Sequence, residues 1–237
     1  MKILLRENSK LFWKSGDLHT QSGVIKEKDL KKNTSLVKTH SGKEFIVLPA
    51  SFLDKIERIK RSPQAITEKD IASIILYSDI SQNSKVLESG TGSGKLTSFL
   101  ARIVFPGKLI SYDINKENLK LSKQNFEFLD LDNIILKNND IYQGIKEKNL
   151  DAVILDLPES YKVLKHASKA LKHGGFLVVF SIHVSQVKKL LEEAKDFIHI
   201  VTLENIQREW LIDERRSRPN SQHLFTGFIT ILRNIKR

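Results

Sequence analysis

Hydrophobic and polar positions follow two different patterns along the chain, which change near residue 60. In the first 50 residues, short apolar stretches of β-strand character occur at 3–5, 11–13, 36–39 and 44–48, and Ser41-Gly42 has the composition of a hairpin turn. Residues 51–60 have a helical pattern, which the residues before Pro63 interrupt. We therefore predict a small β-rich domain over residues 1–62.

The second pattern alternates strands with helices and extends over residues 63–237. Thr67, followed by Asp70, resembles a capping box that opens a helix reaching about Tyr77. Strand-like runs follow at 85–88, 108–112, 134–137, 152–155 and 175–181, separated by helical patterns at 95–105, 116–128, 159–171 and 184–195. This order predicts an α/β fold with a mostly parallel sheet, covered by helices on both faces and binding ligands beyond the carboxyl ends of its strands. The last two strand candidates, 197–203 and 225–232, are expected to pair antiparallel.

The charge of the chain is concentrated at its two ends. The formal net charge is +11, of which residues 1–66 contribute +7 and residues 207–237 contribute +4, while residues 67–206 are neutral. Basic flanks around a neutral body are typical of an enzyme that acts on a polyanion, although Lys-rich solvated faces are an alternative. The chain has no cysteine, which excludes disulfides, thiolate catalysis and zinc sites built from Cys pairs.

Apolar runs are too short to cross a bilayer, and the charged N-terminus lacks the apolar stretch of a signal peptide. The expectation is a soluble cytoplasmic protein with no membrane partner. The seven histidines do not have the spacing of metal ligands on a helix, so no metal site is expected.

The most specific local motif is a glycine-rich turn between a predicted strand and a predicted helix. It reads Glu88-Ser89-Gly90-Thr91-Gly92-Ser93-Gly94. A dinucleotide fingerprint requires Gly or Ala where this chain has Lys95, and a phosphate-binding loop fails at Ser89 and Leu96. Asp113 follows the next strand, where a carboxylate can accept both hydroxyls of a ribose. The alternative is that the glycines serve only a tight turn and that Asp113 caps the next helix.

With Asp140 after the third strand and Asp156 after the fourth, this spacing resembles the class I S-adenosylmethionine-dependent methyltransferases. Further motifs narrow the resemblance: Arg61-Ser62-Pro63-Gln64-Ala65-Ile66, Lys69-Asp70, Asp156-Leu157-Pro158-Glu159, Gly174-Gly175-Phe176, Ser185-Gln186-Val187, Arg208-Glu209-Trp210 and Thr226-Gly227-Phe228-Ile229. In this order they are similar to the tRNA (adenine-N1)-methyltransferases that modify adenine 58 of the T loop, and most similar to archaeal members. The resemblance departs at Thr67-Glu68, where that family often has Tyr-Pro.

The resemblance carries several expectations for this chain. It implies tRNA as partner, adenine 58 as target with its neighbour 57 as a second candidate, Asp156 as the catalytic residue, a small N-terminal β domain in contact with tRNA, and a homotetramer. S-adenosylmethionine is the implied cofactor, and its expected contacts are Gln64, Glu88, Gly90, Thr91, Gly92, Ser93, Gly94, Asp113 and Asp140.

Adenine N1 is already a nucleophile at neutral pH, so its methylation requires positioning and charge stabilisation rather than a strong base. A carboxylate at Asp156 could accept a hydrogen bond from the exocyclic amine and offset the positive charge that develops on the ring. Its alternative role is to cap a helix that begins near Glu159. Arg215, Arg216 and Arg218 are candidates for tRNA phosphate contacts, or else pair with Asp213 or Glu214.

Other function classes stay open at the level of sequence. They are a dinucleotide-dependent oxidoreductase, a non-catalytic tRNA-binding subunit, and a methyltransferase that acts on another RNA or on a protein.

Overall fold

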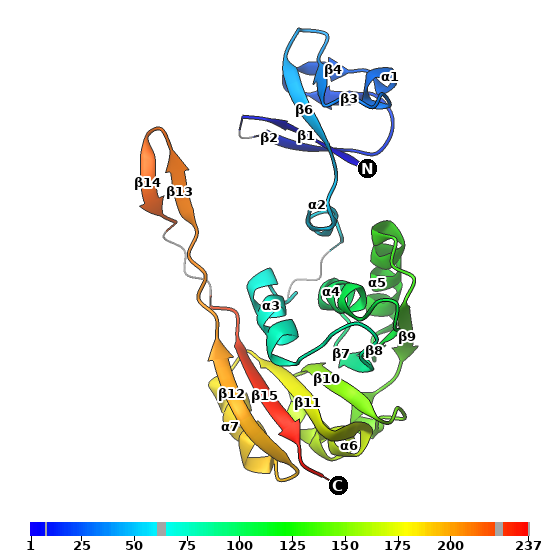
Figure 1. Cartoon of the computed structure of the whole chain (residues 1–237), viewed down its shortest axis with the longest axis vertical. Coiled ribbons are helices and arrows are strands. Elements are labelled where there is room, and N and C mark those ends of the chain that lie inside the picture. Colours follow the sequence, from blue (N-terminus) through cyan, green and yellow to red (C-terminus); the bar gives the residue numbers. More distant parts are fainter. Residues whose placement is uncertain (8, 61–64, 221–224, 237) are drawn as a thin grey trace. The chain divides into compact units, whose positions relative to one another are not determined.

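A computed structural model describes residues 1–7, 9–60, 65–220 and 225–236 of the chain (Figure 1). The chain forms two compact units, Met1–Ile59 and Lys60–Arg237, and each has its own hydrophobic core. The domain boundary expected after residue 62 falls among residues 61–64, outside the described residues.

The first unit is built on an antiparallel sheet with the strand order β2-β1-β6-β5. Its elements are β1 (Lys2–Arg6), β2 (Ser9–Trp13), β3 (Leu18–Thr20), β4 (Gly23–Ile25), α1 (Glu27–Leu30), β5 (Leu36–Lys38), β6 (Glu44–Pro49) and α2 (Phe52–Ile56). Along β6, Phe45 and Val47 alternate with exposed residues and point into a core that also contains Leu4 and Trp13. The predicted strands are confirmed. The hairpin β3–β4 was not predicted, because three-residue strands are too short to display alternation.

The second unit contains a seven-stranded sheet with the order β12-β15-β11-β10-β7-β8-β9. Its strands are β7 (Val86–Ser89), β8 (Leu109–Asp113), β9 (Ile134–Asn138), β10 (Leu150–Asp156), β11 (Leu171–Ser181), β12 (Phe197–Glu204) and β15 (Phe228–Asn234). The pairs among β7 to β11 are parallel, whereas β15 runs antiparallel to both β11 and β12. The predicted parallel sheet and its terminal antiparallel pair are therefore confirmed.

Helices cover both faces of this sheet (Figure 1). They are α3 (Glu68–Tyr77), α4 (Lys95–Val104), α5 (Lys116–Leu129), α6 (Leu164–Ala170) and α7 (Val184–Glu193), with short 3-10 helices η1 (Ile141–Gln143) and η2 (Ser160–Val163). Side chains of β10 alternate between two cores: Val153 and Leu155 belong to one, and Ala152 and Ile154 to the other. Burial on both faces explains why β10 reads as a continuous apolar run in the sequence.

β7 and β10 are parallel neighbours in the sheet, and the order in which the chain adds strands reverses between them. The sheet extends from β7 to β8 and β9 on one side, and from β10 to β11 on the other. The loops that leave the carboxyl ends of these two strands therefore diverge and open a crevice for a ligand.

Between β12 and β15 the chain forms a separate hairpin of β13 (Trp210–Asp213) and β14 (Arg216–Pro219), which the sequence pattern did not reveal. None of the helices in the described residues has the length and hydropathy that a membrane span requires.

Candidate active site

A cavity of about 730 Å³ lies at the carboxyl ends of β7, β8, β10 and β11. It is lined by Ala65, Ile66, Thr67, Gly90, Gly92, Asp113, Asn118, Asp156, Leu157, Pro158, Phe180, Ser181, Ile182, Gln186 and Thr226. Its volume suits a ligand the size of a nucleoside with a side chain. The cavity therefore lies beyond the carboxyl ends of the strands, where the alternation of strands and helices predicts a ligand, and at the point where the strand order reverses.

The glycine-rich turn forms one wall of the cavity, and its glycines are required by close contacts. Gly90 has a φ of +101°, and a Cβ there would lie 2.4 Å from the carbonyl oxygen of Asp156. Gly94 has a φ of +81°, and a Cβ there would lie 2.5 Å from the ring of Phe126. Both backbone conformations are unfavourable for residues with a side chain. The turn thus packs directly on the backbone of Asp156 at one end and on α5 at the other.

Asp113 ends β8, lines the cavity and is tied to the glycine turn. Its Oδ2 accepts hydrogen bonds from the backbone N–H of Gly92 at 2.9 Å and from Nδ2 of Asn118 at 3.1 Å. Its Oδ1 accepts one bond, from the N–H of Asn115 at 2.8 Å. A carboxylate oxygen has two acceptor positions, so Oδ1 can receive a further donor such as a ribose hydroxyl. Asp113 is therefore both a structural anchor of the turn and a candidate ligand contact.

Asp156 ends β10 and lines the cavity beside Gly90. Within the described part of the chain, its carboxylate has no hydrogen-bond partner and faces no basic side chain in the cavity wall. Burial raises the pKa of this carboxyl to about 6. The alternative role as a helix cap is wrong, because η2 begins after Glu159 and has no side-chain cap.

Glu88, expected to contact the cofactor, lies beneath the turn rather than among the residues that line the cavity. It is fully buried, and its Oε2 accepts hydrogen bonds from the hydroxyls of Thr97 and Ser111. Its Oε1 has no partner among the described residues. Burial, with a smaller contribution from the neighbouring carboxylates of Asp156 and Asp113, raises the pKa of Glu88 to about 7.

The remaining predicted cofactor residues occupy different positions. Thr91 and Ser93 line a small space of about 30 Å³ that also borders Asp156 and Lys95. The hydroxyl of Thr91 forms a hydrogen bond with that of Ser111 at 2.6 Å. Asp140 caps η1 through the N–H of Tyr142 at 3.0 Å and is not among the residues that line the cavity. Gln64 lies outside the described residues.

Gln186 is a site residue to which the sequence assigned no role, although it belongs to one of the motifs of the resemblance. Its Oε1 accepts hydrogen bonds from the N–H groups of Ile182 and His183, at 3.1 and 3.0 Å, and its Nε2 donates to the carbonyl of Pro158 at 2.9 Å. The side chain thereby joins the start of α7 to the turn after Asp156. Only the fold brings these segments together, so no local sequence signal could identify this contact.

The three candidate arginines lie on β13–β14 and not in the cavity wall. Arg216 forms an ion pair with Asp213 of the same hairpin, with Nη2 at 2.6 Å from Oδ2. Arg215 and Arg218 are exposed and form no ion pair within the described residues. The hairpin therefore presents unpaired positive charge to solvent.

The cavity wall has a clear charge preference. Its described side chains include two carboxylates, Asp113 and Asp156, and no Lys, Arg or His. Such a wall attracts a cation and repels the two negative charges of a pyrophosphate. This charge argues against a dinucleotide ligand, in addition to the replacement of the fingerprint glycine by Lys95. The ammonium group of Lys95 is buried and lies 2.9 Å from the carboxylate of Glu68. Among the described residues, no group of three or more His, Asp or Glu side chains is arranged to hold a metal ion.

The sheet order, the antiparallel β15 and the glycine turn after β7 define the class I methyltransferase fold. The chain also superimposes on the crystal structure of an S-adenosylmethionine-dependent O-methyltransferase from Thermotoga maritima, with a TM-score of 0.90 and 28% identity, covering 100% of this chain and 93% of that one.

The family follows from the sequence comparisons. Residues 51–226 match the model described as tRNA methyltransferase complex GCD14 subunit, and the chain belongs to this family of tRNA methyltransferases. It is 34% identical to the tRNA (adenine(57)-N(1)/adenine(58)-N(1))-methyltransferase TrmI of Methanocaldococcus jannaschii, over 98% of this chain and 91% of that protein. It is 32% identical to the tRNA (adenine(58)-N(1))-methyltransferase TrmI of Thermus thermophilus, over 85% of this chain and 81% of that protein.

Proposed function

We propose that this protein transfers a methyl group from S-adenosylmethionine to N1 of adenine 58 in the T loop of tRNA, with adenine 57 as a second target. The observation that carries the proposal is the carboxylate of Asp156, which has no hydrogen-bond partner among the described residues and lies beside the glycine turn in a cavity whose described lining contains no basic side chain. The similarity to two TrmI enzymes over most of their length supports the choice of tRNA as substrate and of adenine N1 as target.

The residues present fit the cofactor. S-Adenosylmethionine carries a positive charge on sulfur and another on its amino group, and the wall offers the carboxylates of Asp113 and Asp156 to a cation. The free acceptor position on Asp113 would hold the ribose, and the backbone of Gly90 and Gly92 would lie along the ligand. When bound, S-adenosylmethionine supplies a methyl group on a sulfur that leaves with the electrons of the carbon–sulfur bond.

The reaction needs positioning and charge stabilisation from the protein. The lone pair on adenine N1 forms the new bond to the methyl carbon, and the adenine ring gains a positive charge. The carboxylate of Asp156 would accept a hydrogen bond from the exocyclic amine and stabilise this charge. Since its pKa is about 6, the group is ionised at neutral pH. Gln186 holds the carbonyl of Pro158, which keeps the turn carrying this carboxylate in place.

A non-catalytic subunit would not need this arrangement. The glycine turn, the cavity and a carboxylate on Asp156 that caps no helix support a catalytic role over a purely binding one.

The basic flanks would supply the grip on tRNA. In the first unit, three exposed lysines form no ion pair within the described residues: Lys14, Lys28 and Lys43. Each lysine that neutralises a phosphate adds about 0.7–0.9 to the slope of log affinity against log salt concentration. We propose that this unit and the hairpin β13–β14 contact the tRNA backbone. We further propose that the protein is a homotetramer, as the family resemblance implies, and that it works in the cytoplasm, where tRNA is found.

Four transcripts of one tRNA test the substrate assignment. They carry adenine or guanine at positions 57 and 58 in all combinations and are incubated with labelled S-adenosylmethionine. We expect label in every transcript with adenine 58, and more label when adenine 57 is also present. Equal labelling of the transcript with guanine at both positions would refute the proposed target.

A further inference from the structure

Asp70 is a carboxylate with no solvent exposure that lies outside the catalytic constellation and gathers four side chains from three segments. Its Oδ2 accepts hydrogen bonds from the hydroxyls of Thr67 and Thr226, both at 2.7 Å. Its Oδ1 accepts from Nζ of Lys69 at 2.9 Å and from Nδ2 of Asn205 at 3.0 Å. Burial raises the pKa of Asp70, but the four hydrogen bonds outweigh burial and leave the pKa below its ordinary value, so the group is ionised.

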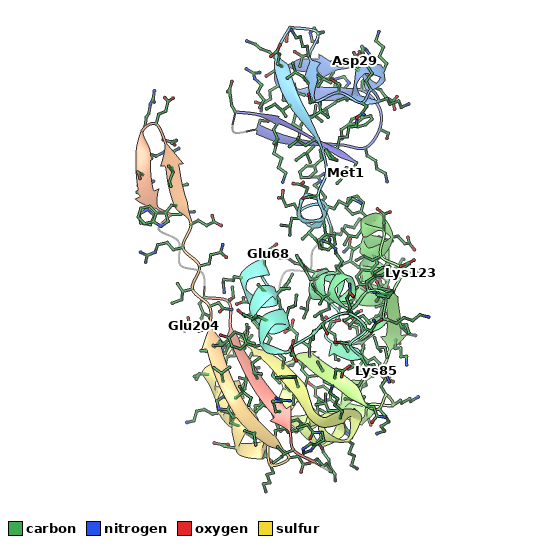
Figure 2. All side chains as sticks on the ribbon, in the orientation of Figure 1. Met1, Asp29, Glu68, Lys85, Lys123 and Glu204 are labelled. Carbon is green, nitrogen blue, oxygen red and sulfur yellow. The ribbon has the colours of Figure 1, made fainter. Side chains whose placement is uncertain are left out.

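Two of these partners stand where the chain leaves and rejoins the sheet. Asn205 follows β12 directly, and Thr226 precedes β15 by two residues. Between them lies the hairpin β13–β14, and we call the described residues 206–220 the arm. Figure 2 shows Glu204 at the end of β12, where the chain leaves the sheet towards this hairpin, and Glu68 at the start of α3. The carboxylate of Asp70 on α3 is thus hydrogen-bonded to the segment before the arm and to the segment after it.

The other two partners connect the same carboxylate to the active site. Thr67 and Thr226 both line the cavity that contains Asp156. Nζ of Lys69 also donates to the hydroxyl of Thr226, at 2.5 Å, so this threonine is held from two sides. A displacement of Thr226, at the base of the arm, therefore moves a side chain of the cavity wall.

The arm itself has the properties of an RNA contact. Arg215 and Arg218 are exposed, and Trp210 presents 56% of its surface to solvent. Guanidinium groups pair with phosphates, and an exposed indole can stack on an unpaired base. Within the described residues, the network of Asp70 links Asn205, which precedes the arm, to Thr226 in the cavity wall.

We propose that Asp70 is a positioning residue that couples the arm to the cavity wall. When the arm binds tRNA, the hydrogen bonds of Asp70 fix the positions of Thr67 and Thr226 in that wall. The inference rests on the proposed function, since the partner of the arm is the tRNA backbone. It adds that binding by the arm and the rate of methyl transfer are energetically coupled through this one carboxylate.

A double-mutant cycle measures this coupling directly. The first change is Asp70→Asn, which keeps the size of the side chain and removes its charge. The second is the paired change Arg215→Ala and Arg218→Ala in the arm. For wild type and each variant, kcat/KM for tRNA is measured at saturating S-adenosylmethionine, together with the Kd for S-adenosylmethionine alone.

In the wild-type background, we expect the arm change to lower kcat/KM by about tenfold, since it removes two phosphate contacts. In the Asp70→Asn background, we expect it to lower kcat/KM by less than about threefold, because the arm no longer reaches the site. Asp70→Asn should change the Kd for S-adenosylmethionine by less than about threefold, since the anchor of the glycine turn at Asp113 is untouched.

The matched control is Asp151→Asn, which changes a half-buried carboxylate near the start of β10 that pairs with Lys172. Its effect and that of the arm change should multiply within about twofold, as for distant sites. If Asp70→Asn fails to fold, Asn205→Ala takes its place, because it removes only one donor to the carboxylate.

If the wild-type protein methylates tRNA and the effects of Asp70→Asn and the arm change multiply, the inference is overturned and the proposed function stands. A wild-type protein that transfers no methyl group to tRNA would overturn the proposed function, and the inference with it.

Discussion

Replacing Asp156 with asparagine separates a catalytic carboxylate from a structural one. Asparagine has nearly the same size and can still accept one hydrogen bond, but it carries no charge to stabilise the methylated ring. The carboxylate has no hydrogen-bond partner to lose within the described residues. Its pKa in the folded state is raised from 3.8 to about 6, so its ionisation in the fold costs about 3 kcal/mol above pH 6. Asp156→Asn should therefore be at least as stable as wild type at pH 8.

The sign of this effect follows from proton binding. Between pH 3.8 and about 6, the folded state holds a proton on Asp156 that the unfolded state has lost. Stability from this group therefore decreases as the pH rises through that window and is constant above it. Thermal unfolding of wild type and Asp156→Asn at pH 5 and pH 8 measures the difference, which should favour the variant at the higher pH.

The loss in Asp156→Asn should appear in the chemical step. Removing one preorganised electrostatic partner lowers rates by about 10² to 10³, or roughly 2.7–4 kcal/mol. Single-turnover methyl transfer at pH 8 measures this step without product release. In wild type, kcat/KM should decrease about tenfold per pH unit below pH 6, because the protonated carboxyl is neutral. The variant should lack this acidic limb.

Asp151→Asn is the matched control, since it makes the same exchange at the other end of β10, where the carboxylate accepts the N–H of Lys85 at 2.7 Å. It should reduce stability and leave the transfer rate unchanged. A wild-type transfer rate in Asp156→Asn, or an unchanged acidic limb, would refute the catalytic role of this carboxylate.

Three further predictions concern the floor and the wall of the cavity. Asp113→Ala should weaken S-adenosylmethionine binding by about 1.5–3 kcal/mol in calorimetry, and an unchanged Kd would contradict the ribose contact. Gly90→Ala should abolish most activity and destabilise the fold by more than about 2 kcal/mol, because its Cβ would collide with the carbonyl of Asp156. Gly42→Ala is the control, since Gly42 has a similar positive φ but open space around it. This variant should lose only about 1 kcal/mol of stability. Equal losses in the two variants would show that the collision at Gly90 is relieved. Glu88→Gln should become progressively more stable than wild type as the pH rises from 4.5 to about 7, because the folded state raises the pKa of Glu88 and penalises its ionised form. A stability difference that does not vary with pH in thermal unfolding would show that Glu88 is not perturbed.

The sequence predicted most of the fold because its strongest signals are long and periodic. The apolar run of β10 and the helical periodicity of α5 are each long enough to indicate the type of element from the sequence alone. The hairpins β3–β4 and β13–β14 were missed, because their strands are only three and four residues long. In β13–β14, charged residues also occupy exposed positions. The helix expected over residues 159–171 begins as η2 and continues as the shorter α6.

Candidate site residues could be proposed from the sequence where local geometry requires a particular residue type. Gly90 follows β7 and Asp156 is the last residue of β10, and both positions could be read from the alternation of elements. The roles of Gln186 and Asp70 could not be read in this way. Each connects segments that are distant in the sequence, such as Asp70 and Thr226, and only the folded sheet brings them together.

The most direct test of the central claim is the identity and position of the methylated nucleoside. Unmodified tRNA is incubated with S-adenosylmethionine and the wild-type protein, then digested and analysed by liquid chromatography and mass spectrometry against standards of 1-methyladenosine, N6-methyladenosine and 2′-O-methyladenosine. The structure predicts 1-methyladenosine at position 58, and a yield at least 10²-fold lower from Asp156→Asn at the same early time point. A ribose-methylated or N6-methylated product, or 1-methyladenosine at equal yield from the variant, would contradict it.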